Sequence, residues 1–234
     1  MVTINIIERP DPVIFAPYQR FFFELLGETE RISIERTRKE KDKIEKMLGW
    51  VLTRMEAAYR YHVHPAAVRI AFHEKGKPYF PDFYDFKFNI THGGSIIAVA
   101  FCNNYEVGID VEATDRKVNL MIAERYFTQS ESEFLEIMPE QQRSHTFLRL
   151  WTIKEAYLKM TGDGLSKPLN SFEIKHDGNE IKIYENEILQ NCTVFQDETD
   201  PKHFITICVK GNENNFTVKR LYLKDIIKPP SILN

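Results

Sequence analysis

Two carboxylates stand two residues apart near the middle of the chain. Asp110 and Glu112 belong to the segment 107–112, in which apolar residues alternate with small or acidic ones. Such alternation predicts a β-strand with both carboxylates on one face and the apolar side chains on the other. Like charges this close repel unless water or a cation lies between them, and carboxylate oxygens are ligands that Mg²⁺ prefers. The pair therefore indicates either a Mg²⁺ site or the polar outer face of a half-buried strand.

A third carboxylate lies on a later segment that is predicted to be helical. Residues 144–161 contain neither proline nor glycine, and Gly162 follows as a stop signal. At about 100° per residue, one helix face carries Leu148, Trp151, Glu155 and Lys159. A surface Glu–Lys pair, which stabilises a helix by about 0.3–0.5 kcal/mol, is one interpretation of this face. The alternative is a covered, functional face on which Glu155 is a third metal ligand.

Two basic side chains occur in turns that glycine or proline shapes. His92 follows the predicted strand 86–90 and precedes two glycines, in Asn-Ile-Thr-His-Gly-Gly. Glycines let a ligand or another backbone come close, and a histidine there can donate to a phosphate oxygen. A turn histidine bonded to backbone fits the same pattern. Lys77 in Gly-Lys-Pro is similarly open between a ligand contact and a solvated side chain.

The sequential order of these four segments carries a resemblance to a known family. The chain contains Gly-Lys-Pro, Asn-Ile-Thr-His, Gly-Ile-Asp-Val-Glu and Trp-x-x-Lys-Glu-x-x-x-Lys, all between residues 76 and 172. This pattern resembles the 4′-phosphopantetheinyl transferases of the larger, surfactin-synthetase-activating type. Such enzymes transfer the phosphopantetheine arm of coenzyme A to a serine of an apo acyl or peptidyl carrier protein. They depend on Mg²⁺ and release adenosine 3′,5′-bisphosphate.

The resemblance also implies roles for particular residues. The metal ligands would be Asp110, Glu112 and Glu155, and catalysis would fall to Glu155, Lys159 and His92. Glu155 would take the serine proton directly or through a metal-bound water, while Lys159 would contact the pyrophosphate. Coenzyme A would be bound by Lys77, Pro78, Thr91, His92, Lys154, Lys159, Arg31 and Lys46. The base that binds the 3′-phosphate is left open among Arg31, Arg36, Arg38 and Lys46.

The surrounding periodicities predict an α+β fold. Helices are expected over 44–61, 119–126, 130–138 and 144–160, strands over 68–72, 86–90, 96–101 and 107–112, and mostly β structure over 172–223. A weak alternation over 2–7 predicts an edge strand, and the charged run 28–46 indicates either a solvated helix or a basic lip over an anionic ligand.

A faint internal repeat divides the chain into two parts. We expect two similar, pseudo-symmetric α+β subdomains, 1–104 and 105–234, the second of which carries the metal-binding motifs. Each would be a small, mostly antiparallel sheet packed with a long helix, and the active site would lie in the cleft between them.

Composition bounds the remaining possibilities. The chain has 234 residues and a net charge of −3, which gives no overall case for binding nucleic acid or membranes. No apolar run approaches the ~20 residues that span a bilayer, and no signal peptide is recognisable. The cysteines Cys102, Cys192 and Cys208 are too widely spaced for a zinc site and are expected to be reduced thiols. We therefore expect a cytoplasmic protein, monomeric by resemblance to the larger family type.

Other functions remain open at this point. One is a non-catalytic module that binds coenzyme A or a carrier protein, and another is a Mg²⁺-dependent phosphohydrolase that uses the same acids. Nothing in the sequence identifies the carrier, which could serve fatty-acid, polyketide, nonribosomal-peptide or lysine synthesis.

Overall fold

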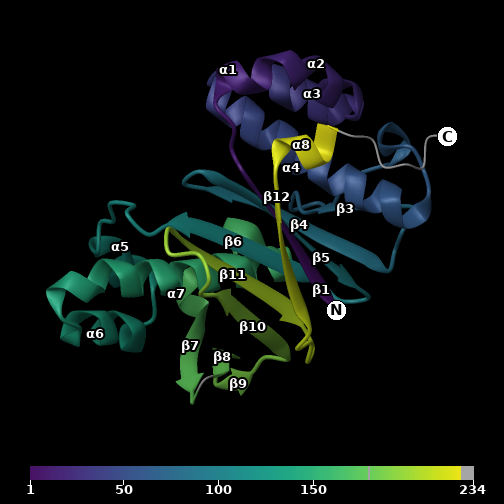
Figure 1. Cartoon of the computed structure of the whole chain (residues 1–234). Coiled ribbons are helices and arrows are strands. Elements are labelled where there is room, and N and C mark those ends of the chain that lie inside the picture. Colours follow the sequence, from purple (N-terminus) through teal and green to yellow (C-terminus); the bar gives the residue numbers. More distant parts are fainter. Residues whose placement is uncertain (179, 228–234) are drawn as a thin grey trace.

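The structure is a computed structural model that describes residues 1–178 and 180–227 (Figure 1). The first part of the chain forms β1 (Val2–Glu8), α1 (Pro12–Phe15), η1 (Ala16–Tyr18), α2 (Gln19–Glu24), α3 (Glu28–Glu35), α4 (Glu40–Tyr61), η2 (Pro65–Ala67), β2 (Ala71–Phe72), β3 (Pro78–Tyr79), β4 (Phe86–Gly93) and β5 (Ile96–Asn103). Here η marks a short 3₁₀ helix.

The second part begins at β6 and contains the other long helix. Its elements are β6 (Val107–Ala113), α5 (Met121–Tyr126), α6 (Gln129–Ile137), α7 (Glu140–Thr161), η3 (Gly164–Ser166), η4 (Leu169–Ser171), β7 (Phe172–Asp177), β8 (Glu180–Glu185), β9 (Ile188–Leu189), β10 (Cys192–Asp197), β11 (His203–Lys210), β12 (Phe216–Leu221) and α8 (Leu223–Ile227). Small sheets and packed helices alternate along the chain, which confirms the predicted α+β class.

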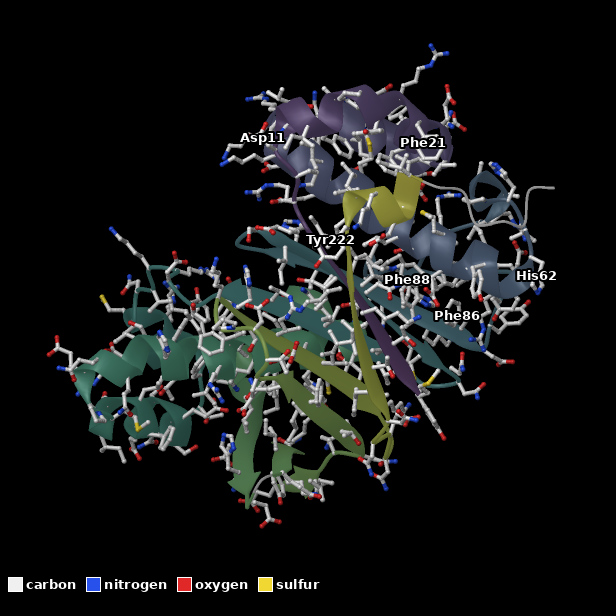
Figure 2. All side chains as sticks on the ribbon, viewed as in Figure 1. Asp11, Phe21, His62, Phe86, Phe88 and Tyr222 are labelled. Carbon is white, nitrogen blue, oxygen red and sulfur yellow. The ribbon has the colours of Figure 1, made fainter. Side chains whose placement is uncertain are left out.

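The first sheet has the strand order β12-β1-β5-β4. In it β1 pairs antiparallel with β5 and parallel with β12. The expectation that residues 2–7 form an edge strand is therefore wrong, because β12 returns from the far end of the chain and covers the free side of β1. Helix α4 packs against β4 and β5, and Phe86 and Phe88 lie in the core that it covers (Figure 2).

The second sheet has the strand order β10-β11-β6, and α7 lies against β6 and β11. Two further small sheets, β2-β3 and β7-β8-β9, complete the fold. Between the two main sheets lies a shared core in which the faces of β1 and β5 meet those of β6 and β11; its centre includes Ile4, Ala98, Ile109 and Ile207. Because Ile109 faces this core, the alternate residues of β6 face α7.

The C-terminal segment crosses back onto the first sheet. Strand β12 pairs with β1 and leads into α8 (Figure 1). Ile226 of α8 is buried in the core to which α4 contributes. The tail of the second sequence half thus completes the sheet of the first half. The division into subdomains between residues 104 and 105 stays a prediction.

The charged run 28–46 is not one solvated helix. It forms α3 and the first turns of α4, with a break between them. Glu30 and Glu45 are buried, and the Glu30 carboxylate is held by Arg54 at 2.8 and 2.9 Å. The sequence pattern missed this because the partner of Glu30 lies 24 residues further along the chain.

Two other expectations can be compared with the structure. The three cysteines are free thiols, as predicted. Over the described ranges, none of the helices combines the length and the apolar character that crossing a bilayer requires.

Candidate active site

A glycine brings β6 and α7 into direct backbone contact. A Cβ placed on Gly108 would lie 2.0 Å from the carbonyl oxygen of Ala156 and 2.3 Å from the backbone nitrogen of Met160. Such distances are impossible for a real side chain, so only glycine permits this approach. The close packing sets the carboxylates of β6 beside the face of α7 that carries Glu155 and Lys159.

Three elements meet around Asp110. Lys159 of α7 donates to Asp110 Oδ1 at 2.6 Å and to Thr91 Oγ1 of β4 at 3.1 Å. Thr91 itself lies 3.3 Å from the same Asp110 oxygen. The second oxygen, Oδ2, is buried and finds no hydrogen-bond donor among the described residues. Burial raises the pKa of Asp110, and the Lys159 ammonium opposes that rise.

Glu112 and Glu155 extend this acidic cluster. Burial raises the pKa of Glu112 to about 7; the Arg116 guanidinium opposes this shift, and the Asp110 charge adds to it. Burial and the Asp110 charge likewise raise the pKa of Glu155. Arg116 forms an ion pair with Glu112 and lies 6.0 Å from the Trp151 ring centroid. The three carboxylates are thus close enough to disfavour one another's ionisation.

The donor chemistry of this cluster suits a hard divalent cation. A buried carboxylate oxygen without a partner is costly unless something binds it, and three acids that repel one another are stabilised by a shared cation. As they stand, however, no three acidic, histidine or cysteine side chains of the described residues are arranged to hold a metal ion. Two of the acids form ion pairs instead, Asp110 with Lys159 and Glu112 with Arg116.

His92 lies at the end of β4. That strand continues through His92 to Gly93, so the chain turns later than the sequence suggested. A Cβ on Gly93 would lie 2.1 Å from the carbonyl oxygen of Val111, which shows that the glycine admits the β6 backbone. The His92 side chain is half exposed, and its Nδ1 lies 3.3 Å from Glu45 Oε2.

Comparison with known proteins decides the family. The model "4′-phosphopantetheinyl transferase, N-terminal" matches residues 17–104, and the model "4′-phosphopantetheinyl transferase superfamily" matches residues 106–208. The chain is 31% identical over 188 residues to 4′-phosphopantetheinyl transferase Sfp of Bacillus subtilis (strain 168), covering 80% of this chain and 83% of that protein. This chain belongs to the 4′-phosphopantetheinyl transferase family.

Other relatives agree with this assignment. The transferase is 29% identical over 187 residues to 4′-phosphopantetheinyl transferase gsp of Aneurinibacillus migulanus, covering 80% of this chain and 77% of that protein. Among solved structures, Thermotoga maritima holo-[acyl-carrier-protein] synthase matches 46% of this chain and 64% of its own, at 20% identity and a TM-score of 0.39.

Lys77 of the transferase is largely buried. Its ammonium donates to Glu106 Oε2 at 2.6 Å and to the carbonyl oxygen of Met160 at 2.7 Å, so it ties β3 to the end of α7. Burial lowers the pKa of Lys77, and Glu106 opposes the shift. Pro78, which follows in β3, is partly buried. The residues of this turn therefore lie near the end of α7, with the lysine charge already satisfied by protein groups.

Lys154 is not placed to contact coenzyme A, and that expectation is corrected. The side chain is 0% exposed, and its ammonium lies 2.8 Å from Glu131. It also donates to the carbonyl oxygens of Leu169 and Phe172 at 2.8 and 2.9 Å. Because successive helix residues are rotated by about 100°, Lys154 points away from the Glu155 side of α7 and into the protein.

The two remaining basic candidates differ in their surroundings. Arg31 donates to the carbonyl oxygens of Phe23 and Glu24 at 3.1 and 2.9 Å, so its guanidinium is used to close the end of α2. Lys46 donates to Thr37 Oγ1 at 2.9 Å. Lys46, Thr37 and Arg36 line a cavity of about 500 Å³, and Arg31 does not.

Three charged residues at the site were not predicted from the sequence. Arg116 holds a carboxylate of the acidic cluster, while Arg9 and Glu45 form an ion pair beside His92. The four-residue spacing between Glu112 and Arg116 was a usable signal, because the chain turns directly after β6. No local signal connects Arg9, Glu45 and His92, which come from three separate segments.

Proposed function

We propose that this transferase moves the phosphopantetheine arm of coenzyme A to a serine of an apo acyl or peptidyl carrier protein. The reaction would depend on Mg²⁺ and release adenosine 3′,5′-bisphosphate. One observation carries the proposal within this family: the three-carboxylate cluster that contains the partnerless Oδ2 atom of Asp110.

Asp110, Glu112 and Glu155 are the residues that would hold Mg²⁺. When bound, the ion would neutralise charge that develops on the pyrophosphate during phosphoryl transfer. Asp110 Oδ2 is open to the ion while Lys159 stays on Oδ1, whereas Arg116 competes with the ion for Glu112.

Glu155 is the group that we assign as general base. Its place on the face of α7 beside Asp110 and Lys159 supports this role, because a general base must lie within reach of the reacting groups. It would accept the proton of the carrier serine as the hydroxyl oxygen attacks phosphorus. Lys159 would bind the pyrophosphate through its ammonium, and the half-exposed His92 would donate to a phosphate.

We assign the 3′-phosphate to Arg36 and Lys46. Both line the same cavity of about 500 Å³, whereas Arg31 is already bonded to two carbonyl oxygens. Two cations on one cavity wall suit a phosphate dianion. We further propose that the transferase acts as a cytoplasmic monomer, without nucleic-acid or membrane partners.

The decisive experiment incubates the protein with coenzyme A, Mg²⁺ and a panel of apo carrier proteins. We expect one carrier to gain the mass of a phosphopantetheine group, and adenosine 3′,5′-bisphosphate to appear in equal amount. Glu155→Gln should abolish the gain while the folded protein still binds coenzyme A. Calorimetric binding of coenzyme A without transfer to any carrier would instead identify a non-catalytic binding module.

A further inference from the structure

A second charged cluster lies at the turn between β4 and β5, separate from the acidic residues of β6. It consists of Arg9, which directly follows β1, Glu45 in the first turns of α4, and His92 at the end of β4. The resemblance assigns a role only to the last of the three. The other two are a nearly buried ion pair whose side chains are 18% and 10% exposed.

Arg9 is fixed from both its backbone and its side chain. Its backbone nitrogen donates to the carbonyl oxygen of Ser95 at 2.7 Å, and its guanidinium donates to the carbonyl oxygen of Gly94 at 3.2 Å. The same guanidinium nitrogen binds Glu45 Oε1. The arginine therefore holds Glu45 against the β4–β5 turn, and its charge offsets the cost of burying the carboxylate.

Glu45 uses its two oxygens on two different partners. Oε1 binds Arg9, and Oε2 lies 3.3 Å from His92 Nδ1. This ion-pair contact turns Nδ1 toward Glu45 and leaves Nε2 on the opposite edge of the imidazole ring. Within the described ranges, no protein group forms a hydrogen bond or ion pair with His92 Nε2. With half of the His92 side chain exposed, Nε2 is free for a ligand.

We propose that Glu45, held by Arg9, is a positioning residue that fixes the His92 ring so that Nε2 is presented to a phosphate of coenzyme A. This inference rests on the proposed coenzyme A-binding role of His92. The physical reason is that a carboxylate in contact with one imidazole nitrogen orients the ring and attracts the protonated form. With a hydrogen on Nδ1, Nε2 donates to a phosphate oxygen only when the ring takes a second proton, and the imidazolium is then a charge-assisted donor.

The first test measures the calorimetric Kd for coenzyme A, which needs no carrier protein. Glu45→Gln keeps the shape of the side chain but removes its charge, and Glu45→Ala removes the oxygens. We expect affinity to fall about tenfold for Glu45→Ala, equivalent to about 1.4 kcal/mol, and less for Glu45→Gln, whose amide keeps an oxygen beside Nδ1. Glu40→Gln, on the same helix and in a surface pair with Lys43, is the matched control and should leave Kd unchanged.

A double-mutant cycle separates positioning from general support of the fold. In a His92→Ala background, Glu45→Gln should cause no further loss of coenzyme A affinity, because its effect acts through the imidazole. An equal loss in both backgrounds would show that Glu45 acts by another route and would overturn the proposal. This comparison uses only the isosteric variant, so it remains valid if Glu45→Ala fails to fold.

Nitrogen-15 NMR of the histidine ring provides a readout that is independent of transferase activity. We expect His92 in the wild-type protein to carry its proton on Nδ1 when neutral, and this preference to disappear in Glu45→Ala and Arg9→Ala. A wild-type ring signature in both variants would refute the positioning role. Absence of phosphopantetheine transfer with these NMR results intact would instead count against the proposed function alone.

Discussion

At the scale of single residues, the acidic cluster is governed by which cation accompanies each carboxylate. Lys159 lies on Asp110 and Arg116 on Glu112, while Asp110 Oδ2 has no partner among the described groups. Two side-chain cations thus contact carboxylates that a divalent ion would also bind. Since every positive charge near a metal site weakens the binding of a further cation, their removal has a predictable sign.

Arg116→Gln should tighten Mg²⁺ binding. The substitution removes a positive charge that competes with the ion for Glu112. An exposed ion pair contributes about 0.7 kcal/mol, so its loss should lower the Kd for Mg²⁺ roughly threefold. Titration calorimetry with Mg²⁺ alone measures the effect. Arg125→Gln on α5, where the guanidinium lies over Tyr126, serves as the control. Weaker Mg²⁺ binding by Arg116→Gln would contradict the competition between the guanidinium and the ion.

Glu112 should make the metal-free protein less stable as pH rises. Its pKa in the folded protein, about 7, lies above the ordinary 4.5, so the folded state binds the proton more tightly than the unfolded state. The resulting stability is fully present below pH 4.5 and is lost as pH rises through 7. Glu112→Gln cannot ionise. The free energy of unfolding of this variant, compared with that of the wild type, should therefore be higher at pH 8 than at pH 5. Denaturant unfolding with a chelator present measures this difference, and a difference that does not change with pH would refute the role of ionisation.

At the scale of elements, the contact between β6 and α7 positions the side chains that we propose as catalytic. Gly108 allows the two backbones to touch, and the carboxylates and Lys159 follow from that packing. The same helix is buried on its other side, where Ile153 and Tyr157 pack into the core of the second half. One rigid helix thus presents Glu155 and Lys159 with little freedom to move.

Gly108→Ala should destabilise the protein and separate α7 from β6. Forcing a methyl group into packed backbone costs about 1–3 kcal/mol, and the displacement should also lower transferase activity. Gly76→Ala is a useful comparison, because its Cβ would meet nothing within 4 Å although its φ is +86°. That variant strains its own backbone but does not push β6 and α7 apart, so its turnover should stay near that of the wild type. Denaturant unfolding and transfer assays on both proteins check the prediction, and equal activity of the two would contradict it.

Lys154→Ala should strongly destabilise the protein. The molecules that remain folded should keep an unchanged active site. The change leaves Glu131 buried without its cation, which typically costs 3–5 kcal/mol. Affinity for coenzyme A, measured well below the unfolding midpoint, should remain that of the wild type. The double variant Lys154→Met with Glu131→Gln removes both charges and should recover part of the stability. A loss of coenzyme A affinity in the stable double variant would show that Lys154 contributes to coenzyme A binding after all.

At the scale of the whole molecule, the two main sheets pack face to face around a shared core, which connects the first half of the chain to the second. The shared core contains Ile4 and Ala98 from the first sheet with Ile109 and Ile207 from the second. Lys77 adds a polar link, because it joins β3 to the last turn of α7. Helix α7 is therefore fixed against both halves of the chain.

The sequence alone determined the site's motifs and most of its elements. Alternation placed Asp110 and Glu112 on one face of a strand, helical periodicity placed Glu155 and Lys159 on one face of a helix, and the motifs pointed to the family. These inferences succeeded because periodicity records the direction of a side chain relative to its own element.

Only the tertiary structure decided which groups meet across elements. It buried Lys154 against Glu131, joined Arg9 and Glu45 beside His92, and returned β12 to cover β1. Each of these contacts joins residues that lie far apart in the chain, where no local pattern records the partner. Local propensity and periodicity set the elements, whereas long-range packing chose the partners of the buried charges and so the final form of the site.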